Sequence, residues 1–176
     1  MATERWNIDT THSNVDFIAR HLVVTKVRGT FGKWSGHLDL DADDLTRSSA
    51  SATFEIASID TREPQRDGHL KSPDFFDAEK YPQMTFASTN LRGGGDAYEL
   101  TGDLTIHGTT KTVTLEVEAQ GKHKDPWGNT RIAFSARGRI NRKDFGLGWN
   151  QVLETGGLLV SEKIEIEIEI QAVKAV

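Results

Sequence analysis

Four isoleucines alternate with glutamates near the end of the chain and decide the local backbone conformation. Residues 163–170 read Lys-Ile-Glu-Ile-Glu-Ile-Glu-Ile. On a helix, with about 100° between successive side chains, the isoleucines would spread around the axis, whereas on a strand they form one face. The segment is therefore predicted to be a β-strand with one apolar and one acidic face, which requires a sheet that buries only one side.

The same two-residue period recurs through most of the chain. It is found at residues 6–8, 15–19, 27–40, 50–56, 84–89, 100–106, 113–119 and 132–140. The links between these segments are mostly of turn length and no strand–helix–strand rhythm appears, so the sheet is expected to be antiparallel. Long strands would leave open edges, and closure into a barrel removes them. The sequence thus predicts an all-β, eight-stranded antiparallel β-barrel with a short additional first strand.

Residues 61–77 depart from this alternation and carry the signals of a short helical insert between strands. Asp60 or Thr61 can cap a first helix that has Pro64 in its opening turn. Ser72 followed by Pro73 is typical of a second helix start.

The insert also carries a set of basic side chains. If the first segment is helical, Arg62, Arg66 and His69 fall on one face. This face is either an ordinary solvated surface, balanced by Glu63 and Asp67, or an anion clamp for the acidic head group of a lipid. The three residues are the head-group candidates.

The inward faces of the expected strands are apolar. The candidate lining residues are Val15, Phe17, Ala19, Phe54, Ile56, Met84, Phe86, Leu104, Ile106, Leu115 and Phe134. From the pattern alone a packed core is the simpler interpretation. The alternative is an apolar cavity that takes an aliphatic tail, since an eight-stranded barrel can either fill with side chains or hold one small ligand.

Composition limits the function further. The 176 residues are expected to form one domain, 1–176, and the absence of cysteine excludes thiol catalysis, disulfides and cysteine metal sites. A net charge of −5 gives no reason to expect nucleic-acid binding. No apolar run reaches the ~20 residues needed to cross a bilayer, so stable membrane insertion is not expected. The start lacks signal-peptide features, which predicts a cytoplasmic location, or a periplasmic or secreted one if a leader was removed.

No catalytic constellation is found in the sequence. The six histidines are scattered without metal-ligand spacing, and no G-x-S-x-G elbow occurs. The protein is therefore expected to have no catalytic residues, no metal and no cofactor, and not to be an enzyme.

Several spaced motifs resemble those of the YceI-like family, the lipocalin-like polyisoprenoid-binding proteins. They are Trp6-x-Ile8-Asp9-x-x-His12-Ser13-x-Val15-x-Phe17, Gly29-x-Phe31-x-x-x-x-Gly36, Ser58-Ile59-x-Thr61, Arg66-Asp67-x-His69-Leu70-x-Ser72-x-x-Phe75-Phe76-Asp77, Tyr81-Pro82-x-Met84-Thr85-Phe86, Gly102-x-Leu104-Thr105-Ile106-x-Gly108 and Asn141-Arg142-x-Asp144-Phe145-Gly146. Together they cover nearly the whole chain in order.

The resemblance implies a lipocalin-like barrel, usually a homodimer, that encloses a long isoprenoid or other amphiphile and binds or carries it rather than transforming it. The expected ligand is a polyprenyl phosphate or an isoprenoid quinone. The alternatives are a fatty acid or fatty amide, or a stress-response interaction module with a filled barrel and no ligand.

Overall fold

The computed structural model describes residues 3–22, 24–150 and 160–175 and is almost entirely β-structure. The strands are β1 (Glu4–Ile8), β2 (Asn14–His21), β3 (Thr25–Phe31), β4 (Trp34–Leu40), β5 (Ser49–Glu55), β6 (Ile59–Asp60), β7 (Gln83–Gly94), β8 (Ala97–Ile106), β9 (Thr109–Lys124), β10 (Thr130–Asn141) and β11 (Lys163–Lys174), and the single α-helix is α1 (Pro64–Lys71).

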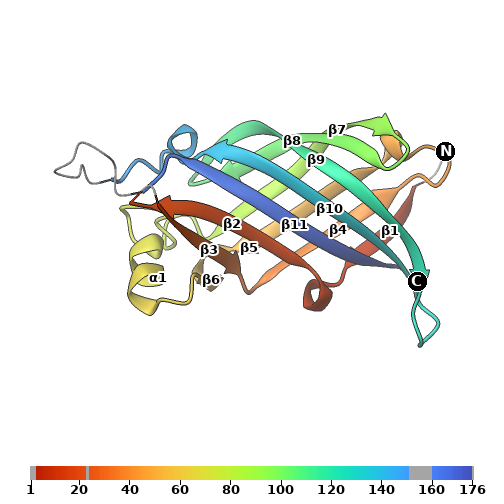
Figure 1. Ribbon diagram of the computed structural model, residues 1–176, viewed down its shortest axis with the longest axis horizontal. Helices are drawn as coiled ribbons and strands as arrows, with labels where there is room; N and C mark the ends of the chain where they lie inside the picture. Colours follow the sequence, from red (N-terminus) through yellow and green to blue (C-terminus); the bar gives the residue numbers. More distant parts are fainter. Residues whose placement is uncertain (1–2, 23, 151–159, 176) are drawn as a thin grey trace.

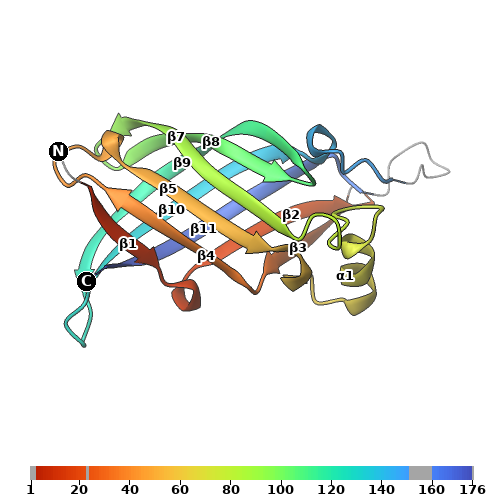
Figure 2. The same ribbon diagram turned by 180° about the vertical axis from the view of Figure 1, so that it is seen from behind.

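The sheet closes on itself. Antiparallel pairs join the strands in the order β1-β4-β5-β7-β8-β9-β10-β11, and a further antiparallel pairing joins β11 back to β1. The ring has eight strands, so the predicted eight-stranded antiparallel barrel is confirmed. Figures 1 and 2 show it as an elongated barrel with both chain ends at one end and α1 at the other.

The structure has more labelled strands than the eight of the ring because the chain is interrupted within some positions of the barrel wall. The strand β11 pairs with β1 through residues 172–174 and with β2 through residues 165–169, so β1 and β2 occupy one position in the barrel wall. The segment 27–40, expected as one strand, is divided into β3 and β4 by a bend at Gly32 and Lys33. β3 pairs with β2, and β4 pairs with β1. The two halves of the segment on either side of the bend therefore pair with two different strands.

The helical insert differs from expectation in two respects. The N-cap of α1 is Glu63, whose carboxylate accepts the Arg66 backbone N–H at 2.6 Å, and neither Asp60 nor Thr61 caps it. Pro64 disfavours helical backbone at the preceding residue, so the helix begins at the proline itself. The second helix predicted at Ser72 is wrong, because residues 73–76 form a turn.

Two apolar clusters lie along the barrel. The larger one surrounds Phe31, Ile56 and Phe145 and includes Leu70 and Phe76, which come from the insert and its following turn. The smaller one, around Trp6 and Leu38, lies in the half that holds the chain ends. A 3₁₀ helix, Arg142–Phe145, follows β10 and places Phe145 in the larger cluster.

An ion-pair network holds the barrel end opposite α1. Arg131 at the start of β10 donates to Asp9 at 2.8 Å and to Asp125 at 2.9 Å. Asp9 also accepts from His12 at 2.7 Å, and these bonds, with that from Arg131 the strongest, lower the pKa of Asp9 to about 2. The network therefore ties the link after β1 to the loop between β9 and β10.

The lowered pKa of Asp9 predicts a specific acid sensitivity. The unfolded chain takes up this proton near pH 4 and the folded protein only near pH 2, so the stability from Asp9 is present above about pH 4 and is lost as the pH falls toward 2. Urea denaturation at stepped pH values should show a shallower loss of unfolding free energy in Asp9→Asn than in the wild type over this window. Identical slopes would contradict the assignment.

Candidate functional site

An apolar cavity of about 290 Å³ lies inside the barrel, close to the lower end of the range of small-molecule sites. Nearly all the side chains that line it are aliphatic or aromatic. The lining includes Leu40 and Ile170 in the half with the chain ends and Leu70 and Phe75 in the α1 half, so the cavity runs along the barrel. Its shape and chemistry suit an extended apolar chain.

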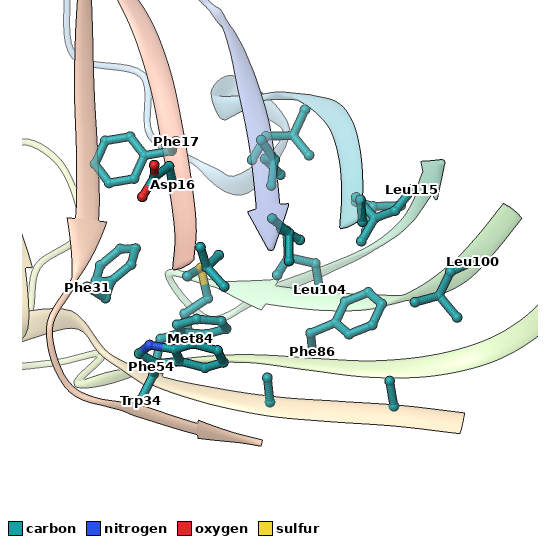
Figure 3. A pocket seen from close by; sticks show the side chains of 18 of the residues that line it. Asp16, Phe17, Phe31, Trp34, Phe54, Met84, Phe86, Leu100, Leu104 and Leu115 are labelled. Atoms are coloured by element: carbon teal, nitrogen blue, oxygen red, sulfur yellow. The ribbon is translucent and has the colours of Figure 1, made fainter. Parts of the chain in front are cut away.

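Ten of the eleven lining residues predicted from the strand alternation face this cavity. The sequence-predicted lining residues that do face the cavity are Val15, Phe17, Ala19, Phe54, Met84, Phe86, Leu104, Ile106, Leu115 and Phe134. Figure 3 shows several of them converging on one space from different strands. Ile56 is outside the lining: β5 ends at Glu55 and a 3₁₀ turn begins, so the two-residue phase is lost and Ile56, 1% exposed, packs within the larger cluster.

Aromatic rings lie against glycines on neighbouring strands, which keeps the cavity open. Phe17 is paired across the sheet with Gly29, and a methyl group at Gly29 would come within 2.3 Å of the Phe17 ring. A methyl group at Gly102 would likewise come within 2.5 Å of the Phe86 ring. Because the glycines leave this space, the rings rest on the wall, and both remain only partly buried although they face inward. The barrel is therefore hollow rather than filled.

The three head-group candidates do not form a common face. Arg62 lies before the helix with φ of 67°, and among the described residues its side chain has no ion pair. Arg66 is occupied within the insert, where its guanidinium donates to the Thr61 hydroxyl and to the Thr61 carbonyl, each at 2.7 Å. The basic stripe expected on one helix face is therefore wrong.

His69 does not line the cavity but packs against a residue that does. Its Nε2 atom lies 2.8 Å from Asp74, and its ring packs edge-on against Phe75, which lines the cavity, and Trp149. None of the three head-group candidates is part of the cavity lining, so contact with a head group stays a prediction for them.

Arg142, which sequence analysis did not select, is the one cation that lines the cavity among the described residues. It is 3% exposed and lies in the α1 half, with its guanidinium 5.9 Å from the Phe75 ring. Its Nε donates to the Ser161 carbonyl at 2.9 Å, and Nη1 donates to the carbonyls of Leu147 and Trp149 at 2.6 and 2.8 Å. Burial therefore places a positive charge at the wall of an apolar space.

Among the described residues, no carboxylate neutralises this charge directly. The four described hydrogen-bond partners of the Arg142 guanidinium are backbone carbonyls, and the bond from Nη2 to Val160 is long, at 3.4 Å. Glu162, the nearest acidic influence, is paired with Lys143 at 2.8 Å. Desolvation lowers the pKa of Arg142, yet a guanidinium stays protonated in proteins. Nη2 carries two N–H groups and makes only this one long contact among the described residues, so it retains capacity to donate to a ligand.

The remaining chemistry of the described residues is limited. They contain no group of three His, Cys, Asp or Glu side chains that could hold a metal ion. Within the same ranges, no helix has the length and apolar character needed to cross a bilayer. The described site therefore offers apolar burial with one cationic position in its wall.

The fold and the cavity define a lipocalin-like β-barrel. The family model of the YceI-like domain matches residues 6–172. The chain thus belongs to the YceI-like family.

Individual relatives agree with this placement. A UPF0312 protein of Staphylococcus epidermidis is 39% identical over 164 residues, which cover 93% of this chain and 94% of that protein. The crystal structure of Burkholderia cenocepacia BcnA superposes with a TM-score of 0.81 at 27% identity, covering 93% of this chain and 98% of that one. A polyisoprenoid-binding domain from Saccharophagus degradans shares the fold, with a TM-score of 0.71 at 16% identity and coverage of 97% and 98%.

The glycine–aromatic contact predicts how the cavity can be closed. In Gly29→Ala the new methyl group must push the Phe17 ring off the wall, because the three nearest atoms all belong to that ring. We expect a smaller cavity and weaker binding of an apolar fluorescent probe, measured by titration. Gly94→Ala is the matched control, since nothing lies within 4 Å of the added atom. Equal probe binding in both variants would show that Phe17 does not limit the lumen.

Proposed function

We propose that the protein binds a long-chain amphiphile of the isoprenoid type, a polyprenyl phosphate or an isoprenoid quinone, and carries or stores it without transforming it. The observation that supports this most directly is the apolar cavity along the barrel, with a buried guanidinium in its wall. The Saccharophagus degradans domain, described as polyisoprenoid-binding, has the same fold and supports the choice of ligand class.

Burial of apolar surface favours binding of an aliphatic ligand chain inside the barrel. Each buried methylene group contributes about 0.8 kcal/mol, and the lining demands no directional partners. A fatty acid or fatty amide would gain from the same lining and remains the alternative ligand. The hollow lumen argues against the other alternative, an interaction module with a filled barrel.

The polar head of the ligand belongs at Arg142 in this proposal. A phosphate or a quinone carbonyl can accept the remaining Nη2 donor, and a phosphate would also offset the buried charge. The chain then extends from the α1 half toward the half that holds the chain ends. Arg62 and His69 could act only from outside the lining observed here.

Extraction tests the occupant directly. Solvent extraction of the purified protein followed by mass spectrometry should release a hydrophobe with the repeating mass of isoprene units. A fatty acid or amide would support the alternative ligand class. A protein that is empty and also fails to bind prenyl phosphates or quinones would refute the proposal.

The location of the chain is tested by narrowing the lumen. Ala136 lines the cavity, and Ala136→Phe should displace part of the chain. Loss of about two methylene contacts costs about 1.6 kcal/mol, or roughly fifteenfold in affinity. Ala87→Phe is the control, because Ala87 is exposed and outside the lining. Equal affinities of the two variants for a prenyl phosphate would place the chain elsewhere.

The role of Arg142 is tested by a ratio of affinities. In Arg142→Met the preference for a prenyl phosphate over the matching prenyl alcohol should fall by about 10- to 150-fold, as expected for a charge-assisted bond of roughly 1.5–3 kcal/mol. The ratio separates head-group recognition from general loss of stability, and Arg142→Lys, which keeps a charge, should retain part of the preference. An unchanged ratio in a folded Arg142→Met variant would remove Arg142 from head-group binding.

A further inference from the structure

The hairpin between β2 and β3 exposes aliphatic side chains at its tip. Leu22 is 44% exposed and Val24 is 79% exposed, and they are two of the three large hydrophobic residues that stand out in this way among the described residues. Leu22 also has φ of 55°, a left-handed conformation that Gly, Asn or Asp adopts far more readily than a branched aliphatic residue. Neither packing nor backbone preference accounts for leucine at this position.

Positive charge surrounds this tip. Between Asp16 and Asp39 the sequence contains no acidic residue but holds Arg20, Lys26, Arg28 and Lys33, in a chain whose net charge is −5. Arg28 is neutralised by Asp16 and Glu167, at 3.0 and 2.9 Å.

Arg20 and Lys26, which flank the tip, are exposed and have no ion pair among the described residues. A second pocket, on the outer wall, groups Arg20 with Arg139 and Lys163, beside Glu162 and Glu165. Of the two acidic residues, Glu162 is already paired with Lys143. Arg20 and Lys26 are thus available to an external anion.

The tip lies at the Arg142 end of the cavity. His21, the last residue of β2, forms a β-bridge with Val160, and Val160 both lines the cavity and accepts the long hydrogen bond from Arg142. Figure 1 shows β2 ending at the same end of the barrel as α1. An apolar tip flanked by cations therefore stands beside the only cationic wall position of the described cavity lining.

We propose that the β2–β3 hairpin docks the protein on an anionic phospholipid surface, with Leu22 and Val24 entering the interface and Arg20 and Lys26 contacting lipid phosphates. Apolar side chains with adjacent Lys and Arg are the combination that binds such surfaces. A second copy of the chain fits less well, because a stable protein interface buries about 800 Å² per partner and a narrow hairpin tip offers little area. The proposal does not depend on what occupies the cavity.

Vesicle binding without any prenyl lipid tests the docking surface. The wild-type protein should sediment with phosphatidylcholine vesicles that contain phosphatidylglycerol, and less with phosphatidylcholine alone or at high salt. The double variant Leu22→Asn/Val24→Thr should lose at least about tenfold in affinity, because each aliphatic side chain gains from burial. It should fold normally, since Asn tolerates the backbone conformation of Leu22.

Two further variants test whether vesicle binding depends on the side chains of the β2–β3 tip rather than on exposed apolar side chains in general. Trp127→Ser removes an apolar side chain that is 79% exposed in the loop between β9 and β10, at the opposite end of the barrel, and should bind like the wild type. Arg20→Gln/Lys26→Gln should lose roughly 25-fold in affinity, at about fivefold for each cation.

Other outcomes would overturn the proposal. These are unchanged binding in Leu22→Asn/Val24→Thr, an equal loss in Trp127→Ser, or no binding by the wild type. Conversion of a dimer to a monomer by the double variant, without vesicle binding by the wild type, would assign the tip to a contact between copies.

Discussion

The antiparallel pairing of β11 with β1 is the constraint on which the rest of the structure depends. It turns an ordered series of hairpins into a ring, so every inward-facing position of eight strands points at one shared space. The same strand also pairs with β2, which allows the chain to break between β1 and β2 while the wall stays continuous. Closure pairs each of the eight strands of the ring with a neighbour on both sides, and the isoleucine face of β11 can then line a cavity rather than pack on a second sheet.

What the closed wall encloses depends on packing across strands. Large inward rings would fill an eight-stranded barrel if they stood upright, but Phe17 and Phe86 lie over glycines and leave the centre free. Toward the α1 end the space is bounded by Leu70, Phe75 and Arg142, so the apolar lining gives way to a buried cation there. The resulting gradient, from a mainly apolar lining to one that contains a buried cation, matches the two-part chemistry of an amphiphile.

The proposed docking surface and the cationic part of the cavity wall lie at the same end of the barrel. Leu22 and Val24 project at the end where Arg142 lines the cavity, while the ion pairs of Arg131 hold the opposite end. In the proposed functions an amphiphile would meet the protein at a membrane surface with its head group near Arg142. The acidic face of β11 and the net negative charge would keep the remainder of the surface away from anionic lipid.

The alternation of apolar and polar residues predicted the regular strands correctly. It failed where a turn or a proline changes the local backbone, and where residues far apart in the sequence determine the environment of a side chain. The Ile–Glu alternation of β11 and the inward faces of β7 and β8 were read correctly because a strand has a strict period of two. Ile56 was misplaced because a 3₁₀ turn shifts that period, and Arg62 because Pro64 delays the helix. The hollow lumen depends on the register of Phe17 against Gly29. The burial of Arg142 depends on the carbonyls of Leu147, Trp149, Val160 and Ser161, which its own neighbours in sequence do not reveal.

A structure of the protein crystallised with a prenyl phosphate tests the central claim most directly. The account predicts continuous ligand density inside the barrel, running from Leu40 past Phe86, with the phosphate within hydrogen-bond distance of Arg142 Nη2 and with Phe17 still resting on Gly29. A lumen filled by inward-turned aromatic rings, or a ligand bound only on the outer wall, would contradict it.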